Sequence, residues 1–138
     1  MALPTFLAVN LVTPRGVIAH TDTDSLQAPG DLGEFELLPG HVPMLTALKA
    51  GVLTIGTKTR ARYAVSTGYL RIDPQGAVEV LVERAKPVAD IDAAAAQSDL
   101  KTAEAELAKW GDKAPDGDYL NLVARADFAR AQIDAVAH

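Results

Sequence analysis

The stretch PGDLGEFELLPGHVPMLTALKAGVL, residues 29–53, decides how the fold of this chain is interpreted. In its middle, Pro39 and Pro43 each fix a backbone φ angle, and Gly40 can adopt a positive φ at no steric cost. His41 lies between the two prolines, and apolar residues follow. The segment therefore predicts a rigid surface protrusion, and such a protrusion suits binding to a partner better than it suits chemistry.

Residue spacing gives no support to a catalytic or metal-binding role of the histidines. His20, His41 and His138 form no HExxH arrangement, and no serine has the setting of a nucleophile elbow. The absence of cysteine excludes disulfides, thiolate metal sites and cysteine nucleophiles. The glycines of residues 30–40 lack the GK[ST] ending of a phosphate loop and predict turns instead. We predict no catalytic residue and no metal site; a triad assembled through space from His41, Ser66 and an aspartate is the remaining catalytic alternative.

The chain has the pattern of β structure as far as Pro87. Residues 5–12, TFLAVNLV, are apolar on both faces and predict a strand buried in a core. Residues 51–73 predict two strands joined by a turn at Gly56, and DPQG, residues 73–76, predicts a type I turn. Many short strands separated by glycine and proline indicate a sandwich or a flattened barrel.

After Pro87 the composition becomes that of a helical hairpin. Residues 90–110 are rich in alanine and contain no proline or glycine, with Asp90 as the predicted N-cap. A second, antiparallel helix follows the short GDKAPDGD segment, with Asp118 as its predicted N-cap. One apolar stripe is predicted on each helix, comprising Leu100, Ala103, Leu107 and Trp110 in the first and Leu122, Ala126, Ala129, Ile133 and Val136 in the second. Because these stripes contain few large side chains, we expect the hairpin to be marginally stable alone and to lean on another surface.

Composition and charge restrict the classes of function. The chain has 138 residues, 49% of them hydrophobic and 22% charged, which indicates one folded main domain with something smaller attached. The net charge of -5 disfavours binding to nucleic acid or to anionic lipid. Residues 87–138 carry the excess, with ten acidic and five basic side chains. No signal peptide or transit segment is apparent, so the protein is expected to work where it is made.

Residues 29–53 resemble the signature of a known family. They are similar to the pattern LPGHxPLLTxLxxG, preceded by a GE pair, of the epsilon subunit of the F-type proton-translocating ATP synthase, called delta in mitochondria. The matching residues are Gly33, Glu34, Pro39, Gly40, His41, Pro43, Leu45, Thr46, Leu48 and Gly51. The resemblance extends over nearly the whole chain. It implies an α+β fold in which a flattened ten-stranded β-sandwich, residues 1–87, precedes an antiparallel two-helix hairpin, residues 88–138.

The resemblance also implies a function. It implies a non-catalytic rotor subunit of the central stalk, which fastens the gamma subunit to the membrane-embedded c-ring and so transmits proton-driven rotation to the catalytic head of alpha and beta subunits. Contact with gamma and the c-ring is expected through Glu34, Pro39, Gly40, His41 and Pro43. The implied location is peripheral, on the cytoplasmic face of a bacterial plasma membrane, with membrane association only through the complex. In many bacterial members the hairpin regulates the enzyme, inhibiting ATP hydrolysis when it is extended.

Two positions depart from the family pattern. Glu36 replaces the glycine that usually stands two residues after the GE glutamate, which changes the charge of the loop expected to face the ring. Members that bind ATP carry I(L)DxxRA at the start of the hairpin, whereas this chain keeps Ile91 and Asp92 but has Ala95 in place of the arginine. Alanine offers no charge-assisted contact to a phosphate group, so we expect no cofactor.

The remaining candidates for a nucleotide site are Ile91, Asp92, Arg125 and Arg130. A free-standing nucleotide-sensing regulatory module built on them is the alternative function, and a small hydrolase that uses His41 is a third. In the family the extended hairpin meets an acidic loop of the beta subunit. Because the hairpin of this chain is itself acidic, we expect its inhibition of ATP hydrolysis to be weak.

Overall fold

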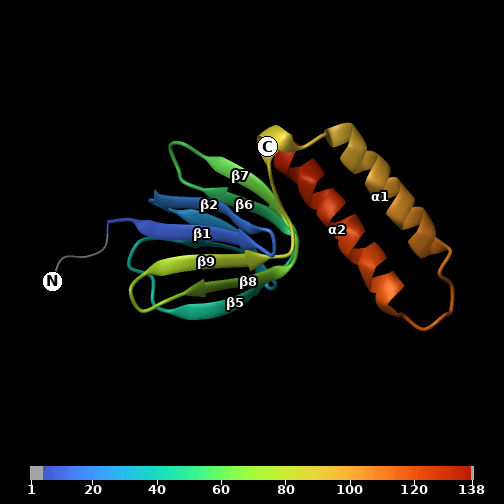
Figure 1. The fold of residues 1–138 in the computed structure, drawn as a ribbon, viewed down its shortest axis with the longest axis horizontal. Helices are drawn as coiled ribbons and strands as arrows, with labels where there is room; N and C mark the ends of the chain where they lie inside the picture. The colour runs from blue at the N-terminus through green and yellow to red at the C-terminus, as the bar shows by residue number, and fades with distance from the viewer. Residues whose placement is uncertain (1–4, 138) are drawn as a thin grey trace.

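A computed structural model describes residues 5–137, so residues 1–4 of the predicted β part and His138 lie outside the described residues. Within the described part, ten strands are followed by two α-helices (Figure 1). The strands are β1 Leu7–Thr13, β2 Gly16–Thr23, β3 Leu26–Gly30, β4 Gly33–Leu37, β5 Met44–Leu48, β6 Gly51–Ile55, β7 Ala61–Val65, β8 Gly68–Ile72, β9 Ala77–Val82 and β10 Ala85–Pro87. The helices are the short 3₁₀ helix η1 Val88–Asp90, α1 Ala93–Ala108 and α2 Gly117–Ala137. The predicted α+β fold, a ten-stranded sandwich followed by two helices, is confirmed.

The strands form one sheet that folds over into two layers. Their order is β10-β7-β6-β3-β5-β8-β9-β1-β2, and β4 pairs with β3 beside this path. The paired strands run antiparallel, except that β1 and β9 run parallel. In the described chain, β3 and β5 share only the pair Gly30 and Leu48, so the sheet turns from one layer to the other at this point. The two layers enclose one apolar core.

The core follows the two-residue period of the strands. In β1, Leu7, Val9 and Leu11 are buried, whereas Asn10 and Val12 on the other side are only partly covered. The predicted burial of this strand in the core is confirmed for one face, whereas its other apolar face is only partly covered, because a strand of a two-layer sandwich has one face on the core and one toward solvent.

The turns at Gly56 and at residues 73–76 lie where the sequence predicts them. Residues 51–73, however, form the three strands β6, β7 and β8 rather than the predicted two, because the chain turns again at Ser66 and Thr67. The backbone N–H of Gly76 donates to the carbonyl oxygen of Asp73 at 3.0 Å and closes the turn between β8 and β9. Gly56, between β6 and β7, has a φ of 94°, and Gly33, at the start of β4, has a φ of 136°. These are backbone conformations that favour glycine over residues with a side chain.

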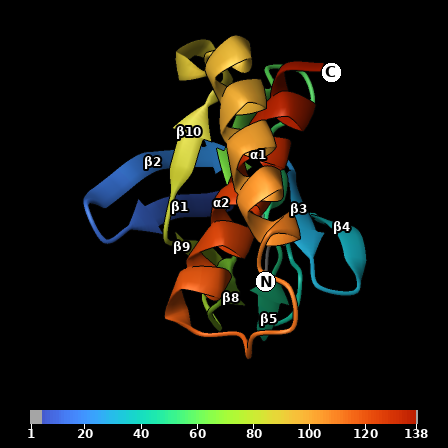
Figure 2. The same cartoon turned by 90° about the vertical axis from the view of Figure 1, so that its right-hand side faces the viewer.

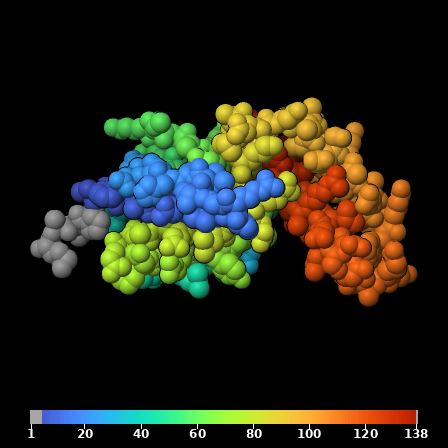
Figure 3. Space-filling view, viewed as in Figure 1, coloured from blue at the N-terminus to red at the C-terminus, as the bar shows by residue number. Residues whose placement is uncertain are grey.

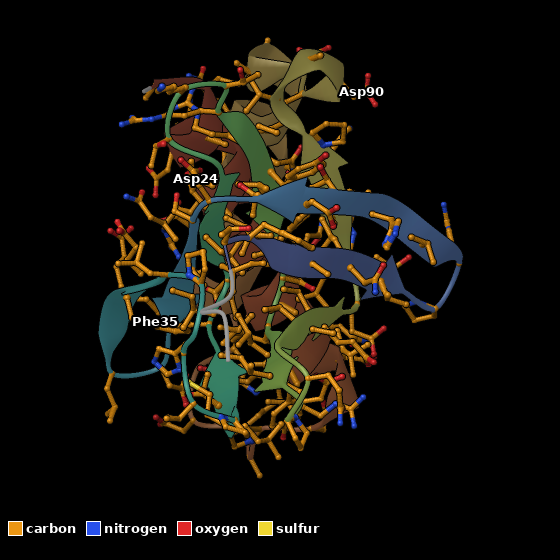
Figure 4. The ribbon with its side chains drawn as sticks, turned by 90° about the vertical axis from the view of Figure 1, so that its left-hand side faces the viewer. Asp24, Phe35 and Asp90 are labelled. Atoms are coloured by element: carbon orange, nitrogen blue, oxygen red, sulfur yellow. The ribbon has the colours of Figure 1, made fainter. Side chains whose placement is uncertain are left out.

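Both helices begin at aspartates, but not at the predicted ones. The Asp92 side chain accepts a hydrogen bond from the backbone N–H of Ala95 at 3.1 Å and is the N-cap of α1. Asp90 instead ends the 3₁₀ turn that precedes the helix, and its side chain extends away from the molecule (Figure 4). In the same way, Asp116 rather than Asp118 accepts from the backbone N–H of Tyr119, at 3.1 Å. Asp90 is taken up by the 3₁₀ turn Val88–Asp90, and Asp118 already lies inside α2, which begins at Gly117.

The hairpin packs across one end of the sandwich. Helix α2 lies between α1 and the strands β6 and β7 (Figures 1 and 2). Phe128, Ala131 and Ala135 of α2 are buried against Ala64 of β7. In the space-filling view the hairpin forms a separate lobe, coloured orange to red (Figure 3). The other surface on which the hairpin was expected to lean is therefore the sandwich. None of the described helices has the length and apolar character that crossing a membrane requires.

Candidate functional site

The segment between β4 and β5 begins with a tight turn at the residues that the sequence singles out. The backbone N–H of His41 donates to the carbonyl oxygen of Leu38 at 3.2 Å, which closes a four-residue turn. Pro39 and Gly40 occupy the two central positions, and Gly40 has a φ of 90°. Proline followed by a residue with positive φ is the requirement of a type II turn. The turn leaves His41 and Pro43 exposed to solvent.

Glu34 lies on β4, at a distance from this turn. Phe35 points inward and packs against the core, so Glu34 and Glu36 on either side of it point outward and are exposed (Figure 4). Glu36 accepts a hydrogen bond from Gln27 on the neighbouring strand at 3.2 Å. Glu34 is near the start of β4 and His41 follows its end, and each strand residue adds about 3.3 Å. The structure therefore places Glu34 and His41 at opposite ends of one strand rather than side by side.

Exposed apolar side chains lie near both ends of β4. Leu32 lies at the tip of the turn between β3 and β4, and Val42 lies beside His41; both are largely exposed. Leu38 and Leu45 are exposed as well. Exposed large apolar side chains that gather in one region commonly mark a site of interaction with another protein.

A second apolar surface crosses the outer side of the sandwich, and sequence reasoning missed it. The strand register places Ala47 of β5, Tyr69 of β8, Leu81 of β9, Val12 of β1 and Val17 of β2 in one row across five strands. The exposed fraction is 57% for Tyr69, 42% for Leu81 and 64% for Val17. We call these five residues the apolar row.

The apolar row lies along a groove and next to a row of mostly polar residues. The groove has a volume of about 650 Å³, and Tyr69, Leu81 and Val12 are among its lining residues. The next row across the sheet is polar except for Leu45 of β5. In it Arg71 and Glu79 form an ion pair at 2.7 Å. Apolar area bordered by polar residues has the composition of a protein interface.

One signal in the sequence could have revealed the apolar row. In the strand AVEVLVERA, Leu81 stands between the inward-facing Val80 and Val82, where alternation calls for a polar residue. Tyr69, a large side chain on the exposed face beside the buried Leu70, is a second exception to the alternation. That Tyr69 and Leu81 lie next to each other follows only from the strand pairing, which the sequence alone does not give.

The nucleotide-site candidates are each engaged in a different contact within the protein. Asp92 is occupied as a helix cap, and Ile91 packs with the apolar contact between hairpin and sandwich. Arg125 pairs with Asp99 on α1 at 3.3 Å, whereas Arg130 pairs with Asp127 of its own helix at 3.1 Å. The four side chains thus serve four separate local contacts.

His41 and Ser66 also have unrelated surroundings. The Nδ1 atom of His41 is 2.9 Å from the carbonyl oxygen of Val42. The hydroxyl oxygen of Ser66 accepts from the backbone N–H of Arg84 at 2.9 Å. A base and a nucleophile must lie within hydrogen-bond reach of each other, and these two side chains are engaged with different backbone groups.

Comparisons with known proteins agree with the fold and with the motif. The family model described as ATP synthase, Delta/Epsilon chain, beta-sandwich domain matches residues 6–88. The chain is 40% identical over 124 residues to the ATP synthase epsilon chain of Geobacter sulfurreducens, which covers 89% of this chain and 88% of the relative. It is 36% identical over 128 residues to ATP synthase epsilon chain 2 of Syntrophotalea carbinolica, which covers 92% and 91%.

Two solved structures share the fold at low sequence identity. A chain of the Euglena gracilis mitochondrial ATP synthase superimposes with a TM-score of 0.79 at 19% identity, covering 100% of this chain and 85% of that one. A chain in the structure of the central stalk and c-ring of the Tetrahymena thermophila mitochondrial ATP synthase gives a TM-score of 0.62 at 16% identity, covering 98% and 99%.

Proposed function

The chain belongs to the family of ATP synthase epsilon chains, and on this premise we propose that it is a non-catalytic rotor subunit of the central stalk. In this role it joins the gamma subunit to the c-ring, so that proton-driven rotation of the ring reaches the catalytic head of alpha and beta subunits. The proposal places it peripherally, on the cytoplasmic face of a bacterial plasma membrane, attached only through the complex. The observation that carries the proposal is the apolar row, an exposed surface that suits a tightly held partner.

We assign the apolar row to the gamma subunit. A permanent interface needs a broad apolar centre, and the row crosses five strands beside a groove of about 650 Å³. Tyr69 supplies a large side chain with a polar tip, which is the kind of residue that often dominates the binding energy of an interface. The rigid backbone of the paired strands keeps this surface in place before the partner arrives.

We assign the narrower protrusions to the c-ring. The turn Leu38–His41 and the turn between β3 and β4 lie at the two ends of β4, and each has exposed apolar residues in it or beside it. His41 and Pro43 contribute to the first contact and Glu34 to the second. Pro39 and Gly40 act indirectly, because their backbone angles hold the turn.

The assignment of the apolar row is tested by the affinity for the purified gamma subunit. Replacing Tyr69 and Leu81 together by aspartate should weaken binding by more than about tenfold, since two charges would be buried without partners. Leu120→Asp on α2 is the matched control, because Leu120 is exposed but lies on the hairpin. Equal affinity of the double variant and the control, with both folded by circular dichroism, would refute the assignment.

The protrusions are tested in the assembled enzyme. Replacing Glu34 and His41 together by alanine should loosen attachment to the c-ring and lower the ATP made per proton translocated. Binding to gamma alone should persist if the two surfaces serve different partners. Unchanged coupling and unchanged attachment would remove both residues from the interface.

We further propose that the hairpin regulates ATP hydrolysis only weakly. Its ten acidic and five basic residues oppose approach to an acidic loop of the beta subunit. Removing residues 88–138 should therefore raise the ATPase rate of the assembled enzyme by less than about twofold at low salt. A many-fold rise would show strong inhibition and overturn this part of the proposal.

A further inference from the structure

A second concave surface lies where the sandwich meets the hairpin, and the proposed function does not use it. It is bounded by the turn between β1 and β2, by the segment that joins β9 to β10, and by α2. Its volume is about 570 Å³, within the range of roughly 300–1,000 Å³ that is usual for small-molecule sites. We call it the junction cleft. Arg15, Arg84, Lys86 and Phe128 are among its lining residues.

The charge of the junction cleft is opposite to that of the molecule. Three cations, Arg15, Arg84 and Lys86, line it with one carboxylate, Glu83, which gives a local net charge of +2. The whole chain has a net charge of -5. None of the three cations forms an ion pair with another described residue. Cations gathered in a concavity without neutralising partners favour an anionic ligand.

Hydrogen bonds fix the main chain of the segments that carry these cations. Arg84 is fixed by Ser66, whose hydroxyl accepts from the backbone N–H of Arg84 and whose own N–H donates to the carbonyl oxygen of Arg84, both at 2.9 Å. Lys86 lies on β10, which pairs with β7. The backbone N–H of Arg15 donates to the hydroxyl of Thr13 at 3.2 Å. A main chain that is already ordered leaves only the side chains to lose entropy when a ligand binds.

The aromatic ring of Phe128 orients one of the cations. The guanidinium carbon of Arg84 is 4.4 Å from the centroid of this ring, so the planar cation lies over the ring face. Stacking of this kind restrains an arginine while its N–H donors remain free to bind at their edge. Arg84 and Lys86 are two residues apart, a spacing that places two side chains on the same side of an extended chain.

We propose that Arg15, Arg84 and Lys86 bind a small soluble phosphoryl anion in the junction cleft. A guanidinium matches the oxygen atoms of a phosphate group with two parallel hydrogen bonds, and a lysine adds a compact positive charge. The residues differ from the nucleotide-site candidates of the family motif, so the proposal depends neither on that motif nor on the stalk function.

The test is isothermal titration calorimetry of the full chain with pyrophosphate at constant ionic strength. We expect saturable binding at one site. Arg84→Gln and Lys86→Gln should each weaken it about tenfold, the effect of losing one charge-assisted interaction. Glu83→Gln should strengthen binding, because it removes a repelling carboxylate from the cleft. A gain in affinity cannot result from misfolding, so this variant keeps the test decisive.

Three further measurements separate specific from general attraction. Lys101→Gln on α1 removes an exposed cation far along the sequence from the cleft and should leave the affinity unchanged. ATP should bind with the same dependence on Arg84 and Lys86 if the phosphoryl groups are what the cleft recognises. Binding to vesicles of phosphatidylglycerol is measured as well, to distinguish a soluble phosphoryl anion from a lipid headgroup.

Several results would overturn the proposal. These are the absence of saturable binding to pyrophosphate, equal weakening by Lys101→Gln and Arg84→Gln, no gain from Glu83→Gln, or binding to vesicles alone.

Discussion

The position of Gly68 leaves no room for a side chain. A Cβ atom added there would lie 2.0 Å from the carbonyl oxygen of Leu81, a backbone atom that cannot move aside without breaking the pairing of β8 with β9. Gly68 thus lets the two strands approach at the edge of the groove beside the apolar row.

Gly68→Ala should lower the free energy of unfolding by about 2 kcal/mol or more, the cost expected of forced overpacking. Urea denaturation measures the change. Gly117→Ala is the control, because a Cβ atom at position 117 meets open space. Similar denaturation midpoints for the two variants would contradict the prediction.

Asp24 links two turns at one end of the sandwich (Figure 4). Its carboxylate accepts from the hydroxyl of Thr57 and, at 3.2 Å, from the backbone N–H of the same residue. The hydrogen bond from the Thr57 side chain is the main cause that lowers the pKa of Asp24 below its ordinary value of 3.8.

A lowered pKa in the folded state makes the contribution of Asp24 to stability depend on pH. The carboxylate stabilises the fold above its unfolded pKa, and this contribution disappears as the pH falls through the lower, folded pKa. Asp24→Asn should therefore flatten the loss of stability between neutral and acidic pH. Urea unfolding of the wild-type chain and of Asp24→Asn from pH 7 down to pH 3 measures this pH dependence. Parallel profiles of stability against pH would contradict a contribution from Asp24.

At the scale of elements, the sequence predicts strands and helices better than it predicts their exposed faces. Turn residues such as Gly56 and Gly76 require particular backbone angles, so they mark the ends of strands directly. In α2, by contrast, an alanine can lie on a buried or an exposed face, so the sequence does not show which face is buried. The predicted stripe through Ala126 and Ala129 is buried, but a second face with Phe128 and Ala131, which was not predicted, is buried as well. Two adjacent buried faces give a helix little amphipathic contrast.

The features of the candidate site also differ in whether local sequence is enough to predict them. The type II turn at Pro39 and Gly40 depends on local residue chemistry, and it was predictable from the sequence. The apolar row was not, because it exists only once five strands are paired in register. The position of the N-cap at Asp92 was missed because the chain first makes a 3₁₀ turn, which the sequence does not signal separately.

Close contact between α1 and α2 depends on small side chains. Ala103 of α1 is completely buried, whereas Ala105 on the same helix is exposed. Ala103→Leu should destabilise the hairpin by about 1–3 kcal/mol through overpacking, and Ala105→Leu should have little effect. Hydrogen exchange of the α1 and α2 amides measures this, with the amides of the sandwich as an internal reference. Equal protection in both variants would contradict the packing argument.

At the scale of the whole molecule, the sandwich has its own core. The buried cluster within the strands draws on residues between Leu7 and Val82, and no described hairpin residue belongs to it. The hairpin adds a separate, smaller cluster around Phe128. This division supports the proposal that residues 1–87 and 88–138 are two domains.

A chain that ends at residue 87 should therefore fold cooperatively. Its stability should be lower than that of the full chain, since removing α2 exposes Ala64 and Val52. Thermal unfolding followed by circular dichroism, with the β signal as the readout, measures the difference. A truncated chain that lacks a cooperative transition would show that the hairpin is part of the folding unit.

The parallel pairing of β1 with β9 has a consequence for the order of events during synthesis. Ala8 pairs with Ala77, so the first strand waits for almost the whole sandwich to leave the ribosome before it gains this neighbour. Until then β1 has only its hairpin with β2, and an isolated two-stranded hairpin is marginally stable in water. Closure of so long a loop makes the last step of assembly slow relative to local turns. The nascent sandwich is thus completed late, when the segment that becomes the helical hairpin is next to emerge.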